Sequence, residues 1–250
     1  MTQWFEEAFG PDYLILYPHR NSADAATAVS YLQRFHKIRP PQTILDLGCG
    51  AGRHSQLLAE NSFEITGVDL SFPLLKEAVS KSAAETLAHL RLVQARMERL
   101  PVREGAFDFV INLFTSFGYF ETDDENLQVL REVSRVLKPG GHLILDYFNT
   151  IWLEKNLRLR NERRLPDGSR VQEQRWIDKE AGRVNKRLKL HTKGEVKEYV
   201  ESVRLYRQED FSPMLSKVGL VQGGTHGDLE GRPFRPTDSP RLIIWAQKPR

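Results

Sequence analysis

The sequence contains very little cysteine and no long apolar run. Cys49 is the only cysteine among 250 residues, so neither an intrachain disulfide nor a cysteine-rich zinc site can form. No stretch approaches the roughly 20 consecutive apolar residues of a membrane-spanning helix. The first residues carry acidic side chains and lack an apolar core, so we expect no signal peptide. We therefore expect a cytoplasmic protein without a membrane segment or a metal.

The sequence also has no large excess of charge of one sign. The net charge is +3 at pH 7, which is too weak to indicate a nucleic-acid partner. The excess of positive charge lies in one segment, since residues 151–210 hold 16 Lys and Arg against 11 Asp and Glu. Such an excess is most often a solvated face, although it also allows a lid whose cations meet an anionic substrate.

Short apolar runs alternate with helical patterns up to residue 150. Residues 3–37 are expected to be helical, with Ser22 as a candidate helix cap, and Pro40-Pro41 ends this region. Strands that alternate with helices predict an α/β, doubly wound, mostly parallel sheet with helices on both faces. The expected strands are 43–47, 64–69, 90–93, 107–113 and 142–147, and the expected helices are 55–61, 72–86 and 126–136, the last closed by Lys138-Pro139-Gly140-Gly141.

The pattern changes after Asn149. Residues 170–178, 184–192 and 196–206 alternate apolar and polar side chains, and turn residues separate them, which predicts an inserted antiparallel β meander. A helix over 208–217 and strands over 220–226 and 242–248 are expected to follow. We therefore expect a core over 1–150, an inserted lid or substrate region over 151–207, and a C-terminal part over 208–250 that completes the core sheet.

The segment over residues 44–54 carries the strongest chemical signal. An apolar strand ends in a loop with glycine at every second position, namely Gly48, Gly50 and Gly52. Glycine allows a sharp turn and the close approach of a ligand, and open α/β sheets bind ligands at such strand ends. The dinucleotide fingerprint G-x-G-x-x-G would need glycine where Arg53 stands. The G-x-G-x-G loop therefore favours a ligand without phosphates.

A carboxylate follows at the distance expected for binding a ribose. Asp69 ends the second predicted strand, 21 residues after Gly48, and can accept both ribose hydroxyls. The alternative for Asp69 is a helix cap or an exposed acid. Leu70 could contact an adenine face, or it could be ordinary core packing.

Three motifs together resemble the class I S-adenosylmethionine (SAM)-dependent methyltransferase family. They are D-L-G-C-G-A-G, then G-V-D-L-S, then R-E-V-S-R-V-L-K-P-G-G-H-L-I-L-D, in the order and spacing of that family over roughly residues 40–150. The last two predicted strands resemble, more loosely, a small-molecule branch with an inserted β lid. The resemblance implies a Rossmann-like seven-stranded sheet, SAM as cofactor and S-adenosylhomocysteine as product.

The resemblance also implies a cofactor site. The glycine loop would line the methionine and ribose, Asp46 would face the methionine amino group, and Arg53 and His54 would lie near its carboxylate. Residues 93–101 match the adenine segment, and the end of the fourth strand should border the methyl group. The implied cofactor residues are Asp46, Gly48, Cys49, Gly50, Gly52, Arg53, His54, Asp69, Leu70, Arg96, Met97, Asn112, Leu113 and Phe114.

One position departs from the family pattern. Arg96 stands where the family commonly has an acid that accepts a hydrogen bond from the adenine amine. An arginine side chain cannot accept that bond, so only backbone contacts near Met97 would remain at this place.

No motif identifies a catalytic residue, because methyl transfer from an activated sulfonium depends mainly on orientation. The candidates for contact with cofactor or acceptor are Tyr17, His19, Tyr147 and Asn149, each with packing or capping as its alternative. His142 and His191 are expected to be structural or on the surface.

Three functions remain open at this point. The first is methyl transfer to an N or O atom of a small-molecule acceptor, which the basic insert allows to be anionic. The second is methylation of RNA or protein through the basic insert, and the third is SAM binding without catalysis. Enzymes that methylate amino groups of nucleic acids commonly have an Asn/Asp-Pro-Pro-aromatic loop after the fourth strand, where this sequence has Asn112-Leu113-Phe114-Thr115. Methylation of cytosine C5 needs a nucleophilic cysteine, and Cys49 lies inside the glycine loop. Both observations disfavour methylation of a nucleic-acid base. The sequence leaves the oligomeric state open.

Overall fold

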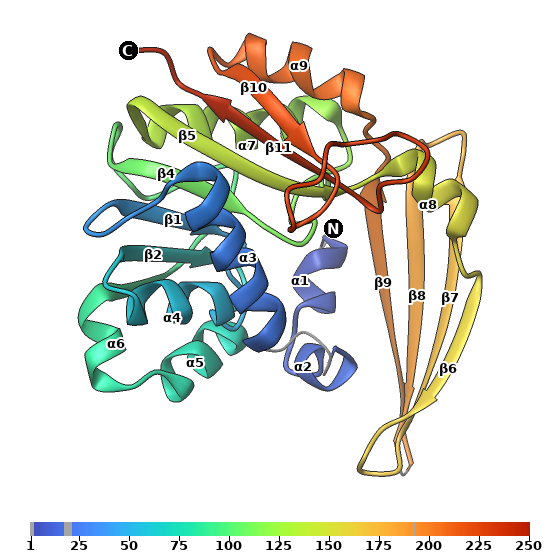
Figure 1. Cartoon of the computed structure of the whole chain (residues 1–250). Coiled ribbons are helices and arrows are strands. Elements are labelled where there is room, and N and C mark those ends of the chain that lie inside the picture. Colours follow the sequence, from blue (N-terminus) through green and yellow to red (C-terminus); the bar gives the residue numbers. More distant parts are fainter. Residues whose placement is uncertain (1–2, 18–21, 193) are drawn as a thin grey trace.

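A computed structural model describes residues 3–17, 22–192 and 194–250 (Figure 1). Its main sheet has seven strands in the order β10-β11-β5-β4-β1-β2-β3. β11 is antiparallel to both of its neighbours, and the other neighbouring pairs are parallel. This confirms the predicted Rossmann-like fold. The strands are β1 (Thr43–Leu47), β2 (Glu64–Asp69), β3 (Leu90–Gln94), β4 (Phe107–Asn112), β5 (Leu137–Phe148), β10 (Val221–His226) and β11 (Arg241–Gln247).

The inner strands of this sheet are largely apolar on both faces, and each face has its own helices. Successive residues such as Ile44 and Leu45 point to opposite faces, and both are fully buried. Ile44 belongs to a cluster with α3 (Ser22–His36) and α4 (Arg53–Glu60). Leu45 belongs to a cluster with α7 (Asp123–Val136) and α9 (Gln208–Lys217). Continuous burial of the strands therefore follows from having helices on both sides.

Several predicted helix boundaries were wrong. The helical region 3–37 is divided into α1 (Trp4–Ala8), α2 (Tyr13–Leu16) and α3, and Ser22 is the first residue of α3 rather than its cap. The predicted helix 72–86 is two helices, α5 (Phe72–Lys81) and α6 (Ala84–His89). α7 begins before residue 126, because Thr122 and Glu125 form a capping box there. Residues 138–141 lie in β5 and do not form a loop that closes α7.

The inserted segment forms a separate four-stranded antiparallel sheet in the order β6-β7-β8-β9. Three of its strands match the predicted meander, namely β7 (Arg170–Asp178), β8 (Arg183–His191) and β9 (Val196–Arg204). The sequence did not predict α8 (Thr150–Asn156) or the edge strand β6 (Arg160–Arg164). We call these four strands the lid sheet.

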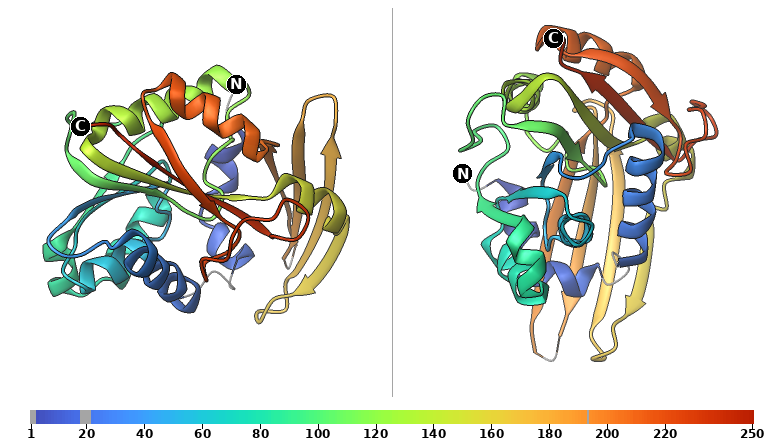
Figure 2. Two further views of the ribbon diagram at one scale, coloured as in Figure 1. Left: turned by 45° about the horizontal axis from the view of Figure 1, so that its top comes forward. Right: turned by 60° about the vertical axis from the view of Figure 1, so that its left-hand side comes forward.

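The lid sheet and the main sheet stand on either side of α1 and α2 (Figures 1 and 2). Leu16 and Tyr17 belong to an apolar cluster with Val171 and Leu188 of the lid sheet. The N-terminal helices therefore lie close to the carboxyl ends of β1, β2 and β4, where a ligand site is expected. None of the helices in the described ranges has the length and apolar character needed to cross a membrane.

A histidine cluster joins α3 to the C-terminal strands. The Tyr31 hydroxyl lies 2.8 Å from His226 Nδ1 and 3.2 Å from His36 Nε2. Burial, together with the neighbouring rings of His226 and His142, lowers the pKa of His36 from 6.5 to about 4. The fold thus requires a neutral His36 ring at this contact.

This requirement predicts acid sensitivity. The pKa of His36 is lower in the folded than in the unfolded chain. The contribution of neutral His36 to the stability of the fold is therefore complete above pH 6.5 and is lost as the pH falls toward 4. The loss attributable to His36 should be on the order of 3 kcal/mol, since one pKa unit corresponds to about 1.4 kcal/mol. We expect His36→Phe to flatten the pH dependence of the unfolding free energy, measured by urea titration between pH 4 and 7.

His89→Phe is the matched control, because its side chain is 41% exposed. It should change the pH dependence less than His36→Phe does. Identical pH dependence in the wild type and His36→Phe would contradict the prediction.

Candidate functional site

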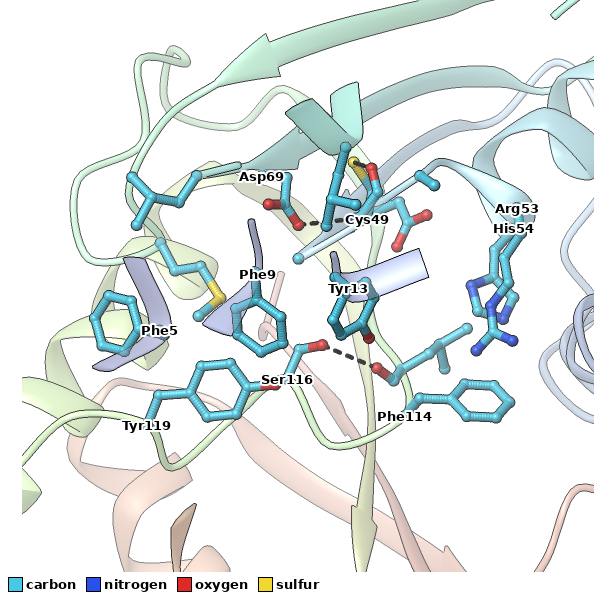
Figure 3. A pocket seen from close by; sticks show the side chains of 18 of the residues that line it. Phe5, Phe9, Tyr13, Cys49, Arg53, His54, Asp69, Phe114, Ser116 and Tyr119 are labelled. Atoms are coloured by element: carbon cyan, nitrogen blue, oxygen red, sulfur yellow. Dashed lines mark hydrogen bonds between the residues drawn. The ribbon is translucent and has the colours of Figure 1, made fainter. Parts of the chain in front are cut away.

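The carboxyl ends of β1, β2 and β4 open into a cavity of about 380 Å³, which we call the cofactor cavity (Figure 3). It lies where the sequence predicted a ligand. Gly52 and Asn112 are not among its lining residues. The other predicted cofactor residues all line it, namely Asp46, Gly48, Cys49, Gly50, Arg53, His54, Asp69, Leu70, Arg96, Met97, Leu113 and Phe114.

The loop after β1 requires its glycines. Gly48, Gly50 and Gly52 have φ angles of 75°, 56° and 74°, which are left-handed and favour glycine. A Cβ atom at Gly48 would lie 2.9 Å from the Cβ of Ser116, and one at Gly52 would lie 2.9 Å from the Cβ of Ala78. Gly52 therefore allows the loop to approach α5 and Gly48 allows it to approach Ser116, whereas Gly50 leaves open space beside the backbone.

Asp69 is fixed by backbone donors at the end of β2. Its Oδ2 accepts a 2.7 Å hydrogen bond from Gly50 N, and its Oδ1 accepts a 2.8 Å bond from Ser71 N. Burial raises the pKa of Asp69 in spite of these bonds. Each carboxylate oxygen can accept a further bond, so the geometry suits a pair of ligand hydroxyls. Figure 3 shows this side chain at the edge of the cavity.

Asp46 and Cys49 are buried beneath the loop. Asp46 accepts a 2.6 Å bond from the Ser55 hydroxyl, and burial raises its pKa to about 6. Burial also raises the pKa of the Cys49 thiol well above its usual value, with a further contribution from Asp46. A neutral, buried thiol is a poor nucleophile, so Cys49 is a packing residue of the loop.

Arg53, His54 and Phe114 lie together at the other end of the cavity (Figure 3). The Arg53 guanidinium carbon is 4.2 Å from the centre of the Phe114 ring, and the His54 ring stacks on it at 5.3 Å. Both polar side chains begin α4, whose amino end favours an anionic ligand group. This end of the cavity therefore suits a carboxylate.

A buried acid determines the position of Phe114. Asp146 is fully buried in β5, accepts a 2.8 Å bond from Phe114 N through Oδ2, and pairs with Arg241. Its carbonyl oxygen accepts a 2.9 Å bond from Thr115 N. Phe114 and Thr115 have φ angles of 56° and 60°, a conformation that residues other than glycine rarely adopt. The Arg241 guanidinium carbon lies 4.4 Å from the Phe114 ring centre.

Asn112 connects two strands beneath the site. Its side-chain amide donates a 2.8 Å bond to the carbonyl of Leu47, and the residue is 2% exposed. It thus ties the end of β4 to the end of β1.

The Arg96 side chain is held by two carboxylates and one amide side chain. It donates to Glu98, to Glu6 at 2.8 Å and to Gln3 at 2.6 Å. Glu98 also lines the cofactor cavity, and its Oε2 is buried without a hydrogen-bond partner in the described part of the chain. Glu98, two residues after Arg96, therefore offers a hydrogen-bond acceptor at this end of the cofactor cavity. The sequence alone did not reveal this acceptor.

The N-terminal helices supply an aromatic wall that the sequence analysis also missed. Phe5, Phe9 and Tyr13 line the cofactor cavity together with Tyr119 from the loop after β4 (Figure 3). Phe9 lies 5.1 Å from Tyr13 and 5.6 Å from Tyr119 between ring centres. The regular spacing of Phe5, Phe9, Tyr13 and Tyr17, four residues apart, was a signal for such a wall.

A second cavity of about 400 Å³ lies between the first cavity and the lid sheet. We call it the lid cavity. Phe9, Phe114 and Tyr119 line both cavities, so the two spaces meet at these rings. The remaining walls come from α1, α8, the end of β5, the start of β11 and the inner face of the lid sheet.

The candidate contact residues occupy different places. Tyr147 lines the lid cavity, is fully buried, and donates its hydroxyl to the carbonyl of Arg204. Asn149 caps α8 through Ile151 N and donates to the carbonyls of Pro236 and Ser239.

Tyr17, a further candidate, lies against the lid sheet. The Tyr17 hydroxyl contacts Glu201 and Lys186 of the lid sheet. His19 lies outside the described residues. The roles of all four candidates stay predictions.

Comparison with known proteins agrees with this geometry. Residues 44–141 match the protein family described as "Methyltransferase domain". A Bacillus subtilis protein named methyltransferase YqeM is 39% identical over 104 residues, which are 41% of each chain. The chain thus matches about two fifths of the length of such curated relatives.

Solved structures share the fold over nearly the whole chain. The CcbJ methyltransferase from Streptomyces caelestis has a TM-score of 0.79 at 19% identity and covers 95% of this chain and 96% of its own. SAM-bound CalS10 from Micromonospora echinaspora, an amino pentose methyltransferase, has a TM-score of 0.66 at 21% identity and covers 94% and 96%. Residues 44–141 thus match a methyltransferase domain, and the whole chain has the fold of these solved structures.

Proposed function

We propose that the protein transfers the methyl group of SAM to an N or O atom of a small molecule held in the lid cavity. The observation that carries this proposal is the junction of the two cavities at Phe9, Phe114 and Tyr119. A space of about 400 Å³ suits a small acceptor better than a nucleic acid or a folded protein. The structural neighbour CalS10 is an amino pentose methyltransferase, which agrees with this interpretation.

The residues of the cofactor cavity fit SAM. Asp69 would bind the ribose hydroxyls, since both of its oxygens are already held by backbone donors. Arg53, at the start of α4, would lie near the methionine carboxylate, and Asp46 near the amino group. Glu98 would accept a hydrogen bond from the adenine amine in place of the acid that Arg96 has replaced. When bound, SAM supplies an already activated methyl group.

The protein's own contribution is orientation and exclusion of water. The aromatic rings of α1, α2 and Tyr119 cover the cofactor cavity, and the lid sheet covers the acceptor. Holding two reactants in line can supply about 7–11 kcal/mol of barrier lowering without a dedicated base. We propose that the insert over 151–207 forms the acceptor side and residues 1–150 the cofactor side, in a cytoplasmic enzyme.

A glycine substitution tests the cofactor site. Gly50→Arg should abolish SAM binding, because its side chain would enter the cavity from the middle of the loop. We expect isothermal titration to show binding of SAM and S-adenosylhomocysteine by the wild type, no binding of NAD, and at least 100-fold weaker binding of both sulfur ligands by the variant.

Gly105→Arg is the matched control. Gly105 is also left-handed, with a φ angle of 60°, and no atom lies within 4 Å of the position that a Cβ atom would take there. Gly105→Arg should have the same conformational cost of a left-handed backbone as Gly50→Arg, and it should bind SAM with the affinity of the wild type. Unchanged affinity in Gly50→Arg would show that the cofactor site has been assigned incorrectly.

A second test concerns the adenine amine. Glu98→Ala should weaken S-adenosylhomocysteine binding about tenfold, since a hydrogen bond to a charged group contributes about 1.5–3 kcal/mol. The wild type should also discriminate strongly against S-inosylhomocysteine, whose ring carries a carbonyl in place of the amine. Calorimetry should show that Glu98→Ala loses most of this discrimination.

Glu6→Ala is the control, because Glu6 also pairs with Arg96 but does not line the cavity. It should keep the preference for the adenine ligand. Equal loss of the preference in both variants would mean that the effect arises from Arg96 and not from contact with Glu98.

A further inference from the structure

The lid cavity has a cationic wall. Arg175 of β7, Lys186 of β8 and Arg241 at the start of β11 all line it, against one carboxylate, Glu201. Arg175 and Lys186 are register partners on neighbouring strands, and Lys186 and Glu201 are partners on the next pair. The lid sheet thus presents a row of charged groups to the cavity.

The two arginines are held by acids that do not line the cavity. Arg241 pairs with Asp146, whose side chain is 0% exposed, and Arg175 pairs with Glu173, whose side chain is 4% exposed. Arginine has five N–H donors, and each of these pairs engages one nitrogen of the guanidinium. The acids therefore orient the guanidinium groups without using all of their donors.

The one lining carboxylate is already engaged. Glu201 accepts the Tyr17 hydroxyl, and its other oxygen lies 3.8 Å from Lys186 Nζ. A ligand ammonium would have to compete with Lys186 for this acid and would meet like charge on Arg175 and Arg241. An anionic ligand group would instead meet donors that are already positioned.

The lid cavity is also lined by aromatic side chains. Trp4, Phe9, Tyr119 and Phe148 line it. The Trp4 ring centre is 4.9 Å from that of Tyr119, and Trp4 Nε1 donates a 3.2 Å bond to the Tyr119 carbonyl. Phe9 and Tyr119 also line the cofactor cavity. Apolar flat surface therefore extends to the place where the methyl group would arrive.

We infer that the acceptor is an anionic molecule built on a flat apolar ring, with its ring against the aromatic wall and its anionic group at Arg175, Lys186 and Arg241. This inference rests on the proposed function, because it names the acceptor class of the same site. The anion is a recognition group bound by these cations, of which Arg241 stacks on the shared Phe114 ring, and the methylated atom is another atom of the same molecule.

Three probes with one ring and different charge test this directly. They are indole-3-acetate, indole-3-acetamide and tryptamine, titrated by ligand-observed NMR with and without S-adenosylhomocysteine. We expect indole-3-acetate to bind at least tenfold more tightly than the amide, and tryptamine to bind most weakly. Lys186→Met should reduce the preference for the acetate over the amide to threefold or less.

Lys189→Met is the matched control, because Lys189 lies on the same strand but pairs with Glu198 away from the lid cavity. It should leave the order and size of the preference unchanged. A preference for tryptamine or the amide, no binding of any probe, or equal effects of the two lysine variants would overturn the inference. Titration with SAM on the same samples separates this failure from failure of the proposed function, since an intact cofactor site would still bind SAM.

Discussion

The arrangement of the site depends on the buried carboxylate of Asp146. This carboxylate accepts a hydrogen bond from Phe114 N, and the backbone carbonyl of Asp146 accepts one from Thr115 N. These two bonds keep Phe114 and Thr115 in a left-handed conformation, although neither is glycine. Such conformations cost about 1–3 kcal/mol each and persist only when the surroundings determine them. The consequence is the position of the Phe114 ring, which forms part of both cavities. One buried acid thus determines where the cofactor cavity and the lid cavity meet.

A buried carboxylate needs a cation, and the chain provides it from a distant segment. β11 pairs antiparallel with β5 in a register that sets Arg241 opposite Phe148 and Ile243 opposite Asp146. Arg241 therefore reaches both the Asp146 carboxylate and the face of Phe114. The C-terminal strand completes the sheet and also neutralises the charge that shapes the site. Removing Arg241 would leave the Asp146 carboxylate buried without its cation, which is far more costly than the pair itself.

Local signals allowed the sequence to predict most of the core but not all of the site. The strand, glycine loop, helix and acid over residues 43–69 were predictable because each depends on nearby residues. β6 was missed because its residues, Arg160–Arg164, have no apolar alternation and are mostly exposed. Glu98 and Asp146 were missed because their roles depend on contacts made across the fold. The replacement of an acid by Arg96 was visible in sequence, whereas the nearby acid Glu98 was not recognised without the cavity.

The basic excess of the insert shows why net charge alone could not indicate a function. Lys186 and Arg187 are adjacent in β8, and alternation along a strand directs their side chains to opposite faces. Lys186 lines the lid cavity, whereas Arg187 lies 2.9 Å from Glu198 and 5.7 Å from the centre of the Trp176 ring. The same positive charge thus has two different environments one residue apart. Strand register, and not the sum of charges over 151–210, decides which cations line the lid cavity.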